Sequence, residues 1–408
     1  MKFRLQGIIY TDFRRGIEID TIIIRKFAFV SDTFKKIRTR IWLILNIAVV
    51  LWVLLGVLCM QVPPYDFWPA GFIAFSLPGA LVLNFLFLLY WALRRSWFLF
   101  LPLAVMVLGW TYYERLLPLG LVKELPPQDA KTLHVMSLNT HMFTAYHGKE
   151  RLTAGVSSEM VDWVASHPAD VYCLQEFYSN PNSKEYDFNI ISRIGARYGK
   201  EHFFSAASSS SKHGDLGVAI FSKFPIVDKG VIHFSEKPSG NRAIWADLDM
   251  DGDTVRVYAT HLQSMSIKAE DIENTYTAIG SDEESFKKEG RNVARRLRNG
   301  FVKRGYQVEL LLEHFKTCPY PFVISGDYND IPFSYTYNEL AKELTNAFVE
   351  AGSGLGATYN GPLPFLRIDN QFYSDGLQAY EFETHYEMAL SDHFPISAKY
   401  MLEPKEEE

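Results

Sequence analysis

The chain has 408 residues, of which 48% are apolar, 22% charged and 15% aromatic. This composition excludes a disordered chain, and 3 cysteines with 26 glycines exclude the disulfide-scaffold and collagen-like classes. With 47 acidic against 41 basic residues, a protein that coats DNA through overall positive charge is excluded as well.

Charge and hydropathy divide the chain near residue 130. Residues 1–130 hold 14 Lys and Arg against 8 Asp and Glu, a net of +6, whereas residues 131–408 hold 27 and 39, a net of −12. The first part contains three charge-free apolar stretches: Ile41–Tyr65, Phe67–Leu93 and Ser96–Tyr113. A bilayer-spanning helix needs about 20 apolar residues, with about 17 as a lower limit.

These stretches predict three transmembrane helices, at about 42–61, 71–93 and 97–113, the third being marginal in length. One stretch alone could be a buried core helix, but three in succession, with tryptophans near their ends, favour a membrane protein. A cleavable signal peptide fits poorly because the first apolar run begins about 40 residues into the chain.

Basic residues in the flanking segments indicate the orientation. Four precede the first stretch, none lies in the connection Gln61–Trp68, and Arg94 and Arg95 fill the link between the second and third stretches. The positive-inside rule then predicts a cytoplasmic N-terminus and an extracytoplasmic C-terminal domain, in the inner membrane if the source is bacterial. If the third stretch does not cross, that domain is cytoplasmic instead.

The remaining segments complete the predicted organisation: a basic N-terminal segment 1–40, a Pro-punctuated linker 114–130, a domain 131–402 and a charged tail 403–408. Within the domain, periodicity predicts helices at Val156–Ser166, Ser285–Phe315 and Tyr335–Glu343, the second interrupted at its glycines. Short apolar runs predict eight strands, near Leu133–Leu138, Val171–Leu174, Val218–Phe221, Ala243–Leu248, Thr254–Ala259, Phe322–Ile324, Ile368–Phe372 and Pro395–Tyr400. Packed sheets covered by helices give an α/β layered architecture.

Polar and ionisable residues recur where these strands end, which is where open sheets build their sites. Each alone could be a turn former or a structural histidine. Together and in this order they predict one site, made of Asn139, Glu176, His261, Asp327, Asn329, Asp369, Asp392 and His393.

The motifs around these residues resemble the endonuclease/exonuclease/phosphatase family. They are SLNTH at 137–141, LQEF at 174–177, GVAIFSKFPI at 217–226, ATHLQS at 259–264, SGDYND at 325–330, RID at 367–369 and SDHFP at 391–395. The resemblance covers about residues 131–402 and implies a four-layer sandwich of two packed mixed β-sheets flanked by helices. It also implies hydrolysis of a phosphate ester that depends on Mg²⁺, with Mn²⁺ as an alternative.

The resemblance further implies a role for each residue. Glu176 is the first choice as metal ligand, with Asn139 and Asp392 completing that group, and hard oxygen ligands suit Mg²⁺ better than Zn²⁺. Asp327 polarises or deprotonates the attacking water. His261, Asn329 and His393 hold phosphate oxygens, and Asp369 fixes the tautomer of His393.

Three functions compete, all with the bilayer as a partner. The favoured one is a membrane-anchored hydrolase, phosphodiesterase or phosphatase, of lipid headgroups or small phosphate esters. The alternative is a membrane-tethered nuclease, which the charge of −12 disfavours for extended nucleic acid. The third is an inactive binding module, disfavoured because every expected catalytic residue type is present. No protein partner follows from the sequence.

The sequence leaves the interpretation of three local features open. The basic stretch Lys287–Arg304 is either a solvated helix face or a nucleic-acid patch, with the first favoured. Asn370 and Gln371 follow Asp369 where the family has an aromatic and apolar residues, which leaves the packing of that strand in doubt. Cys173 and Cys318 could be buried thiols or could pair.

Overall fold

The computed structural model describes residues 33–120, 125–144, 156–180, 189–195, 203–211, 214–236, 239–265 and 283–404. Most of the basic segment 1–40 and the end of the tail 403–408 lie outside these residues. The chain forms two compact units. One comprises the chain up to Leu54 together with Gly79–Leu108, and the other comprises Leu55–Pro78 together with Gly109–Glu408.

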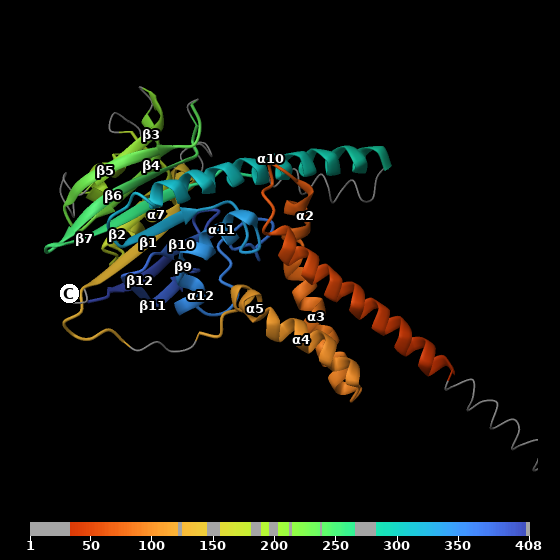
Figure 1. Cartoon of the computed structure of the whole chain (residues 1–408). Helices are drawn as coiled ribbons and strands as arrows, with labels where there is room; N and C mark the ends of the chain where they lie inside the picture. Colours follow the sequence, from red (N-terminus) through yellow and green to blue (C-terminus); the bar gives the residue numbers. More distant parts are fainter. Residues whose placement is uncertain are drawn as a thin grey trace, which may run out of the picture. The chain divides into compact units, whose positions relative to one another are not determined.

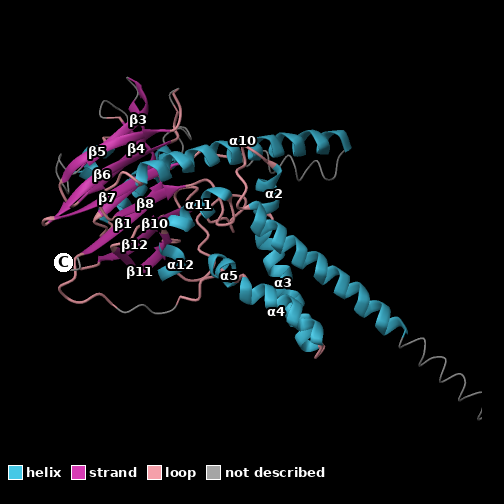
Figure 2. Cartoon of the chain, viewed as in Figure 1, coloured by secondary structure: helices cyan, strands magenta, loops and turns pink. Residues whose placement is uncertain are grey.

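Two six-stranded sheets form most of the second unit (Figure 2). The first has the order β11-β12-β1-β2-β4-β3, and the second has the order β5-β6-β7-β8-β10-β9. Both are mixed, because β1–β2 and β7–β8 pair in parallel while the other neighbours pair antiparallel. The strands are β1 (Thr132–Asn139), β2 (Val171–Ser179), β3 (Phe203–Ser211), β4 (Gly214–Ser222), β5 (Ile226–His233), β6 (Arg242–Met250), β7 (Asp253–His261), β8 (Phe322–Asp327), β9 (Thr345–Asn346), β10 (Asp369–Tyr373), β11 (Leu377–Thr384) and β12 (Ile396–Leu402).

Helices cover the outer faces of both sheets (Figure 1). They are η2 (His141–Thr144), α7 (Val156–Ser166), α8 (Ile190–Gly195), α10 (Glu283–Phe315) and α11 (Tyr335–Glu343). A further short helix, α12 (Ala347–Ala351), contributes Ala347 to the core between the sheets. One apolar cluster lies between the sheets and joins residues such as Val135 and Ile220 to Val257 and Val323. A second cluster packs α7 and α8 on the first sheet, and a third packs α10 and α11 on the second. The prediction of two mixed sheets with helices is confirmed.

The buried polar residues of β10 complete the contact between the sheets. Gln371 donates a hydrogen bond from Nε2 to the carbonyl of Val135 in the other sheet, and Tyr400 donates to its Oε1 at 2.7 Å. A buried amide with its partners in place avoids the cost of an unsatisfied polar group. Gln371 therefore substitutes a hydrogen-bonded bridge for the apolar packing expected after Asp369.

Several elements differ from those predicted. The four strands β3, β5, β9 and β11 and the helices α8 and α12 were not predicted. The stretch 285–315 forms one helix, α10, without a break at its glycines. Gly305 has a packing reason, because a Cβ there would lie 3.3 Å from Pro64 and 3.4 Å from Tyr65. All three cysteines are free thiols, so Cys173 and Cys318 do not pair.

The N-terminal helical region contains one helix, Thr33–Cys59, that is long and apolar enough to cross a membrane. Two bent pairs pass the same test if each is taken as one span: α2 (Pro69–Phe75) with α3 (Leu77–Leu93), at 41°, and Trp97–Leu108 with α5 (Trp110–Leu116), at 73°. Pro78 follows the first bend and Gly109 lies at the second, and both residue types cause helix bends. By length and composition, the described part of the chain therefore holds one candidate span, or up to three if each bent pair forms one.

Buried polar side chains join the helices of the first unit. Trp91 donates its indole N–H to Asn46 at 2.9 Å, and Asn84 donates to the carbonyl of Pro102 at 3.0 Å. Trp91 also packs with Val49 and Phe87. These hydrogen bonds give each of the two buried amides a partner on a neighbouring helix.

The connection between the first two apolar helices packs on α10 within the second unit. Tyr65 stacks on Tyr306 with ring centroids 4.4 Å apart, and Phe72 of α2 contacts Phe301 edge-on at 5.3 Å. The last turn of α5, where the predicted linker 114–130 begins, packs within the same unit: Arg115 donates to Asn338 at 3.3 Å and its carbonyl accepts from Arg367.

Gly326→Ala should destabilise the protein by about 3 kcal/mol, because the new Cβ would clash and the backbone would be strained. Gly326 has φ +155°, and an added Cβ would lie 2.0 Å from the carbonyl oxygen of Thr260. Thermal unfolding of the full chain in detergent measures the effect. The control is Gly290→Ala, where an added Cβ meets nothing within 4 Å. This substitution should stabilise α10 by up to about 1 kcal/mol. Equal melting temperatures for the two variants would contradict this account.

Candidate active site

Strand register in the second sheet places three predicted residues side by side. His261 is the register partner of Asp327 in the parallel pair β7–β8, and Asp369 is its partner in the antiparallel pair β8–β10. All three side chains are buried. The site therefore begins with one acidic residue between a histidine and a second acidic residue, at one end of the sheet.

The first sheet contributes Asn139 and Glu176 to the same end of the sandwich. Asn139 ends β1, and its Nδ2 donates to Asp327 Oδ2 at 3.1 Å. The pairing of β2 with β4 shifts register between Leu174 and Phe177, and Glu176 has φ +46°. Bulges of this kind redirect a side chain next to a site, and a non-glycine residue held at positive φ marks stored strain. Glu176 Oε1 lies 3.9 Å from His261 Nε2.

Asp327 is the centre of this arrangement, with 1% of its surface exposed. Its Oδ1 accepts the backbone N–H of Asn329 at 2.8 Å, and its Oδ2 accepts the side-chain amide of Asn329 at 2.9 Å. His261 Nε2 and His393 Nε2 lie 3.7 and 3.9 Å from Oδ2. The amide of Asn329 also donates to the carbonyl of Leu262 at 3.2 Å, so both of its N–H groups are used. Asn329 thus orients Asp327 in this structure.

His393 and Asp369 form a buried pair, with Nδ1 and Oδ2 2.8 Å apart. Burial by itself lowers the pKa of His393, but the charges of Asp369 and Asp327 outweigh burial and raise the pKa to about 10. The imidazole is therefore held protonated, with Nε2 toward the cavity. Thr358, which the sequence did not indicate, accepts the backbone N–H groups of Ile368 and Asp369 at 3.0 Å each and fixes the start of β10.

Asp392 has a partner that the sequence did not assign. His141 Nδ1 lies 2.9 Å from Asp392 Oδ1. Burial raises the pKa of Asp392, but the hydrogen bond from His141 and the charges of His393 and His141 outweigh it, so the pKa is lowered. Ser391 donates from Oγ to the carbonyl of Asn139 at 2.7 Å and so joins this loop to β1.

A cavity of about 150 Å³ opens over these groups. Seven of the eight predicted residues line it, and Asp369 stands behind His393. The rest of the lining is mostly apolar and comes from Met265, Tyr359, Leu363, Leu366 and Ile368. The site thus combines a cluster of acidic, amide and imidazole groups with an apolar wall.

Among the residues described by the structure, one group has side chains placed to hold a metal ion: Asp327, Asp369 and His393, whose ligand atoms all lie within 4.8 Å of one another. The carboxylates of Glu176 and Asp392 and the amide oxygen of Asn139 line the same cavity. Oxygen donors of this kind fit Mg²⁺ or Mn²⁺.

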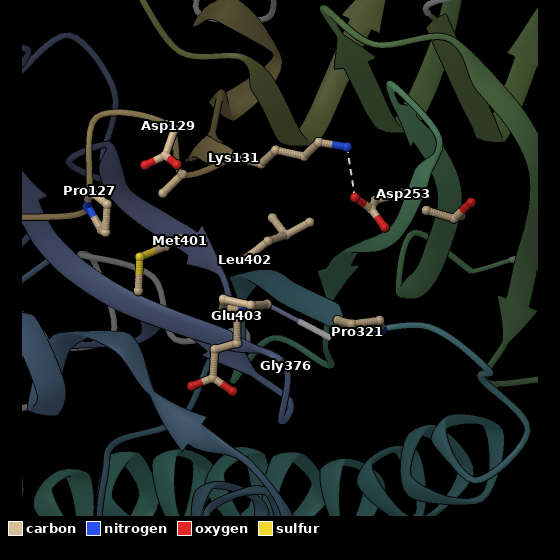
Figure 3. A pocket seen from close by; sticks show the side chains of 12 residues that line it. Pro127, Asp129, Lys131, Asp253, Pro321, Gly376, Met401, Leu402 and Glu403 are labelled. Carbon is tan, nitrogen blue, oxygen red and sulfur yellow. Dashed lines mark hydrogen bonds and ion pairs between the residues drawn. The ribbon is translucent and has the colours of Figure 1, made fainter. Parts of the chain in front are cut away.

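A larger cavity, of about 510 Å³, lies at the opposite end of the strands (Figure 3). Its lining includes Lys131 before β1, Thr254 at the start of β7 and Pro321 before β8. Lys131 Nζ forms an ion pair with Asp253 at 2.7 Å. None of the predicted site residues lines this cavity.

The sequence profile of the endonuclease/exonuclease/phosphatase family matches residues 136–393, well over half of the chain. The chain belongs to this family. Members of the family are metal-dependent phosphoesterases, and the match extends from β1 to the His393 loop, so it includes every residue of the site. A second profile, described only as a domain of unknown function, matches residues 39–116.

Several solved structures are similar to this chain at low identity. A protein of this family from Beutenbergia cavernae is 18% identical with a TM-score of 0.47, over 67% of this chain and 72% of its own. One from Bacteroides thetaiotaomicron is 17% identical with a TM-score of 0.47, over 68% and 100%. The catalytic domain of human Nocturnin is 16% identical with a TM-score of 0.44, over 67% and 95%. Comparison with curated proteins gave no match.

Proposed function

We propose that the chain is a membrane-anchored, Mg²⁺-dependent phosphoester hydrolase in which Asp327 activates the attacking water. The observation that carries this proposal is the environment of Asp327. Its carboxylate is oriented by Asn139 and Asn329 and faced by His261 and His393. A buried, oriented carboxylate at the edge of a cavity can remove a proton from water as the water attacks phosphorus in line.

The chain's own residues divide the work of hydrolysis. Asp327 orients the water and takes its proton. His393, kept protonated by Asp369, places a positive charge where negative charge develops on the phosphate oxygens. His261 donates to a phosphate oxygen from the opposite side of Asp327. Asn329 holds Asp327, and it reaches a phosphate oxygen only if it releases Leu262 or Asp327.

Glu176, Asp392 and Asn139 would hold the metal. Their oxygens border the cavity beside Asp327, and the Glu176 side chain is 35% exposed, so it remains accessible to a cation. When bound, Mg²⁺ supplies positive charge that stabilises the phosphate oxygens. His393 fits this role less well, because its Nδ1 is bonded to Asp369 and its raised pKa keeps the ring protonated.

The lining of the cavity favours a substrate that carries an apolar group beside its phosphate. Tyr359, Leu363 and Leu366 face the phosphate site, and they would contact the apolar part of a phospholipid or of a small ester. The net charge of −12 on residues 131–408 opposes an extended nucleic acid. Phospholipid headgroups and small phosphate esters are therefore the proposed substrates.

The contacts of the second unit support three spans and an extracytoplasmic catalytic domain. Both the connection that contains Tyr65 and the last turn of α5, which contains Arg115, contact this domain. Two chain segments on one domain lie on one side of a membrane, so the chain between them crosses an even number of times. The α2–α3 pair and the Trp97–Leu108 segment with α5 provide those two crossings, with Arg94 and Arg95 on the cytoplasmic side.

Asp327→Asn should reduce hydrolysis by about 10²- to 10⁴-fold, because the amide keeps the shape of the side chain but cannot take a proton. Hydrolysis of sphingomyelin, phosphoinositides, a chromogenic phosphodiester and plasmid DNA, with and without Mg²⁺, measures the effect. Asp253→Asn, in the cavity at the opposite end of the strands, is the matched control. Near wild-type turnover in a folded Asp327→Asn protein would remove Asp327 from the role of base.

Glu176→Gln should raise the Mg²⁺ concentration needed for half-maximal activity by about tenfold or more, because a neutral amide is a poorer ligand for a hard cation. Calorimetric titration with Mn²⁺ should show the same loss of affinity without an assay of activity. Glu313→Gln, on the exposed face of α10, is the control. If metal affinity stays unchanged, the cation is held by Asp327, Asp369 and His393 instead.

A C-terminal alkaline-phosphatase fusion in a bacterial host should be active, and a C-terminal green-fluorescent-protein fusion should be dark. Both follow from an extracytoplasmic domain, since alkaline phosphatase needs its disulfides and these form outside the cytoplasm. The same reporters fused after Arg95 are the control and should give the reverse pair. A dark alkaline-phosphatase and a bright fluorescent fusion at the C-terminus would place the domain in the cytoplasm.

A further inference from the structure

The connection between the first two apolar helices is short and aromatic. It runs from the end of the Thr33–Cys59 helix to Pro69, and its Phe67 and Trp68 are 52% and 41% exposed. If both helices span the bilayer, so short a connection stays at the level of the lipid headgroups, where exposed tryptophans are favoured. Because α10 packs on this connection, α10 then lies at the same depth relative to the bilayer.

Helix α10 touches this segment through one face. The guanidinium of Arg298 lies 5.2 Å from the ring centre of Trp68, and Phe301 packs on Phe72. One and two turns further on, Gly305 approaches Pro64, and Glu309 accepts a hydrogen bond from the Tyr65 hydroxyl. Because helical positions three and four apart share a face, these contacts define one stripe along α10. Figure 1 shows α10 continuing beyond α2.

The same stripe becomes basic where α10 passes beyond the connection. Lys287, Arg291, Arg295 and Arg298 follow one another at spacings of four, four and three residues, and all four are exposed. Residues 287–303 contain seven Lys and Arg but only one acidic residue, Glu289. The face of α10 that contacts the headgroup-level connection is therefore continuous with a basic face.

We propose that the N-terminal half of α10 lies on the membrane surface and binds anionic phospholipid headgroups through Lys287, Arg291, Arg295 and Arg298. This rests on the proposed membrane anchoring and is independent of the catalytic proposal. Lys and Arg held near an anionic leaflet are attracted to it, and the attraction falls off within a Debye length. Trp68 and Phe67 add the aromatic contact with the interface.

The charge distribution of the domain explains why the membrane surface, and not a nucleic acid, is the expected partner of this face of α10. Residues 131–408 carry a net of −12, so an anionic surface repels the domain as a whole. The basic stripe is the exception, and its contact with Trp68 holds it where lipid headgroups are present at high local concentration. Binding there would turn the domain toward the bilayer in one orientation.

The test uses the full chain in nanodiscs of phosphatidylcholine, alone or mixed with phosphatidylglycerol, with a trace lipid that carries a nitroxide on its headgroup. A fluorophore is attached at Ala294→Cys, in the centre of the stripe, in a Cys318→Ser background. Ala294 is exposed, and the other two cysteines are buried. The matched position is Glu313→Cys, near the other end of α10. Gln61→Cys reports the connection itself.

Quenching at position 294 should exceed quenching at 313 by about twofold or more in the anionic nanodiscs, and should fall in phosphatidylcholine or in high salt. The triple variant Arg291→Gln, Arg295→Gln, Arg298→Gln should lose the dependence on phosphatidylglycerol. Equal quenching at positions 294 and 313 would overturn the proposal. Quenching at 294 that does not change with lipid charge or salt would overturn it as well.

Two further outcomes separate this proposal from membrane anchoring. Quenching at 61 without quenching at 294 would leave the anchoring intact and overturn the role of α10. Quenching at neither position would overturn both. In a third outcome, labelled single-stranded DNA binds the nanodisc-embedded protein at position 294, this binding is lost in the triple variant, and position 294 shows no lipid quenching. That result would identify the stripe as a nucleic-acid surface and would also overturn the proposal.

Discussion

The buried charge of Asp327 is the constraint on which the site and the junction of the two sheets depend. A carboxylate with 1% exposure is costly unless hydrogen bonds and nearby cations compensate for its lost hydration. Here the compensation comes from both sheets, through Asn139 at the end of β1 and Asn329 after β8. The ends of the two sheets must therefore meet, and the same contact that satisfies Asp327 also closes the floor of the cavity.

Much of this fold was predictable because its elements carry strong local patterns. The helices Val156–Ser166 and Tyr335–Glu343 have the limits predicted from periodicity, and each predicted strand is present. The elements that were not predicted have weak patterns. β3 runs through a serine tract, β5 is a partly exposed edge strand, and β9 has two residues. α10 continues through Gly300 because tertiary contacts outweigh the helix propensity of single residues: Phe301 packs on Phe72, and Val308 packs on the second sheet.

The residues of the site divide in the same way: those in a local sequence pattern were predicted, and those defined only by a tertiary partner were not. All eight residues were predicted because each ends a strand or stands in a short motif, and the structure brings them together. Thr358, His141 and Ser391 were not assigned, because each acts only on a group that the fold brings to it. Thr358 contacts β10 eleven positions later, and Ser391 contacts Asn139, which is 252 positions away in sequence. Such positioning residues have no signature in a single sequence.

Arg304 joins the loops of the site to the part of α10 that packs on α2 and on the connection before it. Its buried guanidinium donates to Asp330 at 2.9 Å and to the carbonyl of Gln263 at 2.9 Å, so it holds the loops that follow β8 and β7. Those loops directly follow Asn329 and His261. Three positions before Arg304, Phe301 contacts Phe72 of α2, and one position after Arg304, Gly305 packs against Pro64 of the connection between the first two apolar helices. Neighbouring residues of one helix therefore hold both the loops of the site and the connection between the apolar helices.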